Sequence, residues 1–170
     1  MKIFLDANGR SVSLPKDEKI SWRISGYALI EDRGKILVVV PTWNTQFELP
    51  GGGIEEEEGL KQGILRECYE ETGYHVILPD ASPFYVGEEN FYHRHLHKFY
   101  HSLIVVYRVR LRSHRQNLKA INVSDGDEIS KISWEELSVF TRKNAHRIIY
   151  PAIQRYQGLK NRKFSGSFSV

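Results

Sequence analysis

Apolar residues along this chain occur mostly in short runs that suit β-strands. Residues 36–40 form a continuous β-branched run, as expected of a strand buried on both faces. Residues 102–111 form a second long run, and Asn8-Gly9 between two short runs predicts a hairpin over residues 1–14. Further strands are predicted at residues 20–30, 47–49, 75–78, 84–87 and 128–134.

Two stretches have helical spacing. The first ends at Gly73, a residue suited to a left-handed C-cap, and its apolar stripe is predicted to face the core. That stripe consists of Leu60, Ile64 and Cys68. Strands combined with one early and one late helix predict an α+β protein.

The second helix is predicted at residues 142–157. Pro151 lies inside this range and is expected to kink or interrupt the helix. Residues 158–170 are rich in glycine, serine and lysine, and they are predicted to form a mobile tail or to dock on a partner. No internal repeat or composition shift divides the sequence, so residues 1–170 are expected to form one domain.

Composition narrows the class of protein. Hydrophobic residues make up 41% of the chain and charged residues 26%, which is ordinary for a globular domain. The net charge of +3 is too small to indicate nucleic-acid binding by itself. A single cysteine fits a reducing compartment, and no apolar run approaches the roughly 18 residues of a membrane span. We therefore expect a cytoplasmic protein without a membrane segment.

An acidic pattern follows the glycines at residues 51–53. Glu67, Glu70 and Glu71 are spaced so that they share one face of the first helix. Neighbouring carboxylates repel one another, and a shared cation reverses that repulsion. Carboxylate oxygens suit Mg²⁺ or Mn²⁺. The alternative is a solvated acidic helix face with no ligand.

The full pattern resembles the Nudix box of the MutT-like hydrolases. Every charged and glycine position of that box is matched, by Gly52, Glu58, Arg66, Glu67, Glu70, Glu71 and Gly73. Cys68 and Tyr74 stand where the family usually has an aliphatic residue. The resemblance implies an α/β/α sandwich around a mixed sheet, with the box as a loop–helix–loop at one edge.

The resemblance also implies chemistry: Mg²⁺- or Mn²⁺-dependent hydrolysis of a phosphoanhydride in a nucleoside diphosphate linked to another moiety. Glu70 and Glu71 are then metal ligands, and Glu67 is either a ligand or the general base. Glu58 and the carbonyl group of Gly51 complete the implied metal site, and Arg66 orients a glutamate. Outside the box, Glu128 is the leading candidate for the base, with Glu88 and Glu89 as runners-up.

Several residues outside the box are candidates for substrate binding. Trp43 and Phe47 precede the glycines and are predicted to stack on a base, the alternative being that they pack in the core. Arg23 is predicted to face phosphate. Residues 88–101 are predicted to form a long loop in which His93 and His95 contact substrate. Zinc binding by His93, His95, His97 and His101, or an ordinary surface or packing role, is the alternative for this segment.

Three functional alternatives remain open. The first is a non-catalytic, nucleotide-binding regulator, although such regulators tend to lose box glutamates and none is lost here. The second is an RNA 5′-end pyrophosphohydrolase that uses Arg108, Arg110 and Arg112 and the basic residues 160–163. The third is a histidine-rich metal-binding module. The sequence selects neither the nucleotide substrate nor the oligomeric state, and the family resemblance favours a homodimer only weakly over a monomer.

Overall fold

The computed structural model describes residues 2–79, 82–121 and 129–165, with side chains up to Asn161. The strands are β1 (Ile3–Leu5), β2 (Ser11–Ser13), β3 (Ile20–Asp32), β4 (Lys35–Pro41), β5 (Gly51–Gly53), β6 (Val76–Ile77), β7 (Tyr85–His93), β8 (Lys98–Leu111) and β9 (Ile129–Glu136). The helices are α1 (Leu60–Thr72) and α2 (Tyr150–Ser165), with short 3₁₀ turns η1 (Leu118–Ala120) and η2 (Leu137–Val139).

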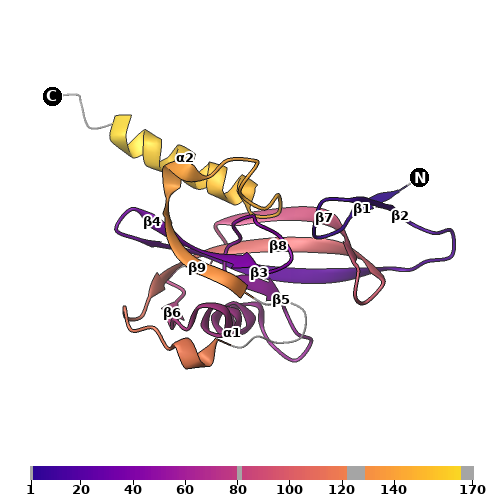
Figure 1. Ribbon diagram of the computed structural model, residues 1–170, viewed down its shortest axis with the longest axis horizontal. Coiled ribbons are helices and arrows are strands. Elements are labelled where there is room, and N and C mark those ends of the chain that lie inside the picture. Colours follow the sequence, from indigo (N-terminus) through magenta and orange to yellow (C-terminus); the bar gives the residue numbers. More distant parts are fainter. Residues whose placement is uncertain (1, 80–81, 122–128, 166–170) are drawn as a thin grey trace.

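The strands form a mixed sheet in the order β2-β1-β7-β8-β3-β4-β9. The β1–β7 and β3–β8 pairs are parallel, and the other neighbours along this path are antiparallel. Strand β5 pairs with β3, and β6 pairs with β8. The long strands β3, β7 and β8 extend past the helices and carry the β1–β2 hairpin at their far end (Figure 1).

Helices α1 and α2 cover opposite faces of the sheet (Figure 1). One core cluster lies on the α2 side and includes Val38 and Ile153, whereas the other lies on the α1 side and includes Leu37 and Ile64. Alternate residues of β4 therefore enter different cores, which explains its continuous apolar run. The predicted α+β fold, with a mixed sheet between helices, is confirmed.

The second helix is displaced from its predicted position. Helix α2 begins at Tyr150, not at residue 142, and runs to Ser165. Pro151 therefore lies in the first turn, where its missing N–H removes no helical hydrogen bond. Residues 158–165 continue this helix, so the predicted tail is helical over that part. Residues 166–170 lie outside the described residues.

Residues 88–101 form a hairpin, so the predicted loop is wrong. Strands β7 and β8 pair from Tyr85↔Val106 to His93↔Lys98. The ring centroids of Tyr92 and Phe99 lie 4.6 Å apart across the hairpin. Such cross-strand aromatic pairs stabilise a sheet, and they account for the aromatic composition of the segment.

The N-terminal hairpin is confirmed, with Leu5 opposite Ser11 across the turn that contains Gly9. In the described part of the chain, no helix has the length and apolar character needed to cross a membrane.

Candidate active site

The glycine segment forms strand β5. Gly51, Gly52 and Gly53 pair with residues 25–27 of β3. Gly51 has φ of 140°, and a Cβ atom there would lie 2.1 Å from the carbonyl oxygen of Gly26. Only glycine fits at this position, because both the backbone conformation and the space exclude a side chain.

Helix α1 packs directly behind these glycines. Ile64 and Cys68 are fully buried, and burial raises the pKa of the Cys68 thiol. The helix ends at Gly73, whose N–H bonds to the carbonyl of Tyr69 and whose φ of 70° gives the predicted left-handed cap. A Cβ at Gly52 would lie 2.9 Å from Oε1 of Glu67, so this glycine lets a helix carboxylate approach the strand.

Arg66 holds three carboxylates together. Its Nε and Nη2 donate to the two oxygens of Glu58, at 3.0 and 2.6 Å. Its Nη1 donates to Glu67 at 3.1 Å and to Glu70 at 2.9 Å. The hydrogen bonds from Arg66 lower the pKa of Glu58, and the same carboxylates raise the pKa of Arg66. The cluster keeps a net negative charge, because one guanidinium faces three carboxylates.

Glu71 faces the glycine strand. Its Oε2 accepts a hydrogen bond of 2.8 Å from the N–H of Gly51. The carboxylates of the box therefore gather beside β5. Arg66 bonds to three of them, and the fourth, Glu71, bonds to the backbone of Gly51.

The donor chemistry fits a hard cation. No three histidine, cysteine, aspartate or glutamate side chains within the described ranges form a ready-made metal cage. The side chains that converge on Arg66 and Gly51 are nevertheless all carboxylates, which are the preferred protein ligands of Mg²⁺. Their excess negative charge is the second feature that suits a divalent cation.

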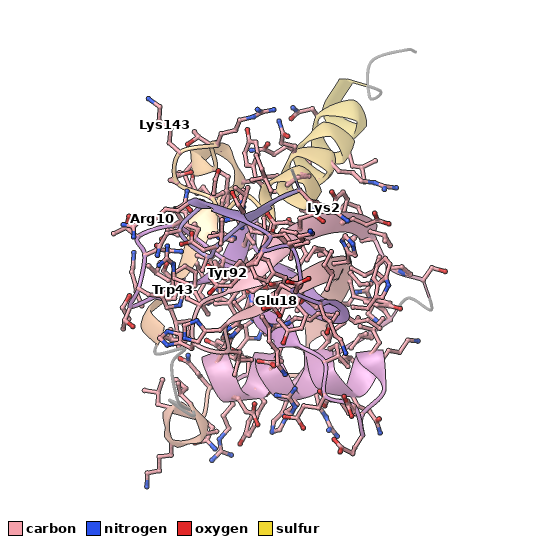
Figure 2. The ribbon with its side chains drawn as sticks, turned by 90° about the vertical axis from the view of Figure 1, so that its right-hand side faces the viewer. Lys2, Arg10, Glu18, Trp43, Tyr92 and Lys143 are labelled. Atoms are coloured by element: carbon pink, nitrogen blue, oxygen red, sulfur yellow. The ribbon has the colours of Figure 1, made fainter. Side chains whose placement is uncertain are left out.

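A cleft of about 180 Å³ opens beside Gly51, Gly52 and Glu71. Four of the five residues predicted to bind substrate line it: Arg23, Trp43, His93 and His95. The fifth, Phe47, packs against Phe140 with ring centroids 5.6 Å apart, and it belongs to the α2-side core. In Figure 2, Trp43 lies below helix α2 and above helix α1.

A family model described as NUDIX domain matches residues 22–156. The chain belongs to the Nudix family. A MutT-like protein from Streptomyces ambofaciens is 36% identical over 62 residues, which are 36% of this chain and 40% of that protein. The chain therefore matches less than half the length of this relative.

Solved Nudix structures share the fold. A NUDIX hydrolase from Nitrosomonas europaea has a TM-score of 0.60 at 20% identity, over 82% of this chain and 91% of that one. A MutT protein from Methanosarcina mazei Go1 has a TM-score of 0.58 at 22% identity, over 86% and 99%. Identities this low show the Nudix fold and leave the substrate open.

Arg23 lies on β3 within the Nudix cleft. Its Cζ atom lies 5.9 Å from the ring centroid of Phe91 and 5.8 Å from that of Tyr100. Its guanidinium also lies over the glycine strand, because a Cβ at Gly53 would come within 2.7 Å of Nη2. In the described part of the chain it forms no ion pair, so its charge is available to an anionic ligand.

The spacing of residues in the sequence does not predict several cleft residues, among them Ala7, Asn8, Arg94 and His146. His146 is buried, its Nε2 lies 3.0 Å from the carbonyl oxygen of Ala7, and burial lowers its pKa to about 4. This histidine therefore donates to Ala7 in its neutral form. No local pattern marks these residues, because long-range pairing brings them together.

The described residues place none of the candidate bases outside the Nudix box in the cleft. Glu128 lies outside the described residues. Glu89 forms an ion pair of 2.5 Å with Arg147, and burial raises the pKa of its carboxyl group. It does not line the cleft beside Gly51, and neither does Glu88.

The histidines of the β7–β8 hairpin separate into two groups. His93 and His95 line the cleft, with ring centroids 6.3 Å apart. His101 instead contacts Lys2 at 2.9 Å and Asn90 at 2.8 Å, and His97 contacts Tyr92 at 3.2 Å. The predicted zinc alternative therefore has no group of ligands among the described residues.

Proposed function

We propose that this protein hydrolyses a phosphoanhydride bond in a nucleoside diphosphate linked to another moiety, with Mg²⁺ or Mn²⁺ as cofactor. One observation carries the proposal: the carboxylate face of α1 meets the glycine strand at the edge of a cleft lined by aromatic and cationic side chains. Hydrolysis of a diphosphate needs negative ligands for a metal and, beside them, a cavity for the organic parts of the substrate.

Each residue of the site has a role in this proposal. Glu67, Glu70, Glu71, Glu58 and the Gly51 carbonyl would hold the metal, which neutralises phosphate charge and lowers the pKa of bound water. Arg66 keeps three of these carboxylates in place. Arg23 binds a phosphate oxygen, and Trp43 stacks on a planar ring. Either Glu67 or Glu128 takes the proton of the attacking water.

The test is a hydrolysis screen over nucleoside diphosphate derivatives with Mg²⁺ or Mn²⁺, in which chromatography detects the nucleoside monophosphate and the phosphorylated second product. A Glu70→Gln variant runs beside the native protein, and circular dichroism checks that both are folded. Turnover of one class, lost in the variant and in EDTA, supports hydrolysis and names the substrate. A folded protein that binds a nucleotide but turns over nothing points to the non-catalytic regulator.

A further inference from the structure

The N-terminal hairpin holds a buried charge next to the cleft residues Ala7 and Asn8. Asp6 is 0% exposed, which is unusual for an aspartate. Its Oδ1 accepts from the N–H of Arg10 at 2.8 Å, and its Oδ2 accepts from Nε of Arg94 at 2.5 Å. Burial raises the pKa of this carboxyl group, but the bonds from Arg10 and Arg94 outweigh burial and hold the pKa below its usual value. Asp6 is therefore charged.

A second tie holds the same hairpin against the cleft. The carbonyl oxygen of Ala7 is 3.0 Å from Nε2 of His146 and 3.4 Å from Nη1 of Arg147. Arg147 is in turn held by Glu89 at 2.5 Å. The turn of the β1–β2 hairpin is thus fixed from two sides, although it is far in sequence from its partners.

These contacts orient Arg94. The side-chain hydrogen bond that Arg94 makes within the described residues uses Nε, which leaves the terminal N–H groups of the guanidinium for other partners. The side chain is 51% exposed and lines the cleft beside Asn8, His93 and His95. A guanidinium fixed in one orientation presents a fork that matches a carboxylate or a phosphate.

We propose that Arg94, positioned by Asp6, recognises a second anionic group on the substrate, away from the diphosphate that is cleaved. This inference rests on the proposed function, since it places the diphosphate at the glycine strand and α1. The preferred substrates then carry a carboxylate or an additional phosphate. Asp6 is a positioning residue, because it acts on substrate only through Arg94.

Two matched pairs of compounds test the charge preference. UDP-glucuronate and UDP-glucose differ in one carboxylate, and NADPH and NADH differ in one phosphate. We expect kcat/KM to favour the member with the additional anionic group over its partner by about 10- to 100-fold, the range of a charge-assisted hydrogen-bonded pair. The first pair reports a carboxylate and the second reports a phosphate, so together they identify the group.

Four variants separate recognition from a structural tie. Arg94→Gln should reduce toward one the ratio of kcat/KM between the compound with the additional anionic group and its partner. Asp6→Asn keeps an acceptor for the N–H of Arg10 and should reduce this ratio only partly. The double variant should have the same ratio as Arg94→Gln. An equal loss of kcat/KM on all four compounds would mean that Asp6 and Arg94 only stabilise the hairpin. Lys160→Gln breaks the ion pair with Glu31 outside the cleft and should leave the ratio unchanged.

Equilibrium titration in EDTA makes the result independent of turnover. If the compounds with the additional anionic group bind more tightly and Arg94→Gln removes the difference, the inference stands even when no compound is hydrolysed, and only the proposed function fails. If compounds are hydrolysed or bound without any preference for charge, or if none binds, the inference is overturned.

Discussion

The carboxylate face of α1 and the cleft beside it are built in different ways. The carboxylate face uses residues 51–73, and Arg66 joins Glu58 to Glu70 within this short segment. The cleft uses Ala7, Trp43 and His146, which come from three distant parts of the chain. The chemistry of the site is therefore local in sequence, whereas its selectivity depends on the whole fold.

This difference determines how each region responds to changes elsewhere in the chain. The box is complete once a helix and a glycine strand meet, so its geometry tolerates changes elsewhere. The cleft changes whenever a hairpin or loop that lines it changes, because its lining residues come from several separate segments. Substitutions at the two regions should accordingly have different effects.

The largest expected effect is on catalysis. Glu67→Gln and Glu70→Gln should each lower kcat by about 10²- to 10⁴-fold, the range for a lost proton acceptor or metal ligand. The matched controls are Glu56→Gln and Glu57→Gln, which remove exposed charges from the same acidic run. Steady-state kinetics on one substrate checks this. Equal losses in all four variants would show that only total negative charge matters.

Alanine substitutions at two glycines of β5 should have different effects, one on stability and the other on catalysis. Gly51→Ala places a Cβ against the Gly26 carbonyl and should lower the free energy of unfolding by about 3 kcal/mol. Gly52→Ala meets only the carboxylate of Glu67, so the fold should survive while turnover falls. Urea unfolding and kinetics measure both effects.

Gly158→Ala in α2 is the control for the two glycine substitutions. Nothing lies within 4 Å of the added Cβ, and alanine favours a helix, so stability should rise slightly. A Gly51→Ala protein as stable as the native one would contradict the packing of β5 on β3.

Mildly acidic pH should lower the free energy of unfolding, through the buried histidine of the cleft. Burial lowers the pKa of His146 from 6.5 to about 4, so the folded chain keeps the ring neutral where the unfolded chain protonates it. The unfolded state binds more protons in this window, and the free energy of unfolding should fall by up to about 3 kcal/mol as pH drops from about 6.5 to 4. Urea titrations of the native protein and of His146→Gln measure it. Equal pH slopes would refute this role.

The smallest expected effect is on substrate affinity. Trp43→Ala should raise KM about tenfold with little change in kcat, because stacking acts on ground state and transition state alike. Trp22→Ala is the matched control, since Trp22 is 71% exposed and does not line this cleft. Kinetics on the substrate found in the screen decides. A fall in kcat without a rise in KM would place Trp43 in the catalytic step.

Local patterns predicted local structure well. Helical spacing placed α1 and its glycine cap correctly, and the β-branched run of β4 correctly predicted burial on both faces. Apolar spacing alone predicts the start of α2 too early, at residue 142, whereas Pro151 suits the first turn of a helix and marks the observed start.

Local spacing rules do not predict which distant segments of the chain come together. The β7–β8 hairpin was missed because its turn, residues 94–97, has neither glycine nor proline, and His97 itself adopts φ of 51°. The cleft residues Ala7, Arg94 and His146 were missed because no spacing rule connects positions that only a sheet brings together. The prediction of substrate contact agrees with the cleft lining for Arg23, Trp43, His93 and His95. It fails for Phe47, because an aromatic residue near the glycine strand can equally well pack in the core.

The parallel pairing of β3 with β8 also sets the order in which the site can form. Ile20 pairs with Phe99 and Ile30 with Val109, so each contact closes a loop of about 80 residues. Helix α1 lies inside that loop, and a helix of 13 residues is only marginally stable without the core that it packs against. At roughly 5–20 residues per second, the ribosome needs a few more seconds to complete β8. The glutamates of α1 therefore leave the ribosome first, and they become part of a stable helix only once the sheet covers the apolar face of α1.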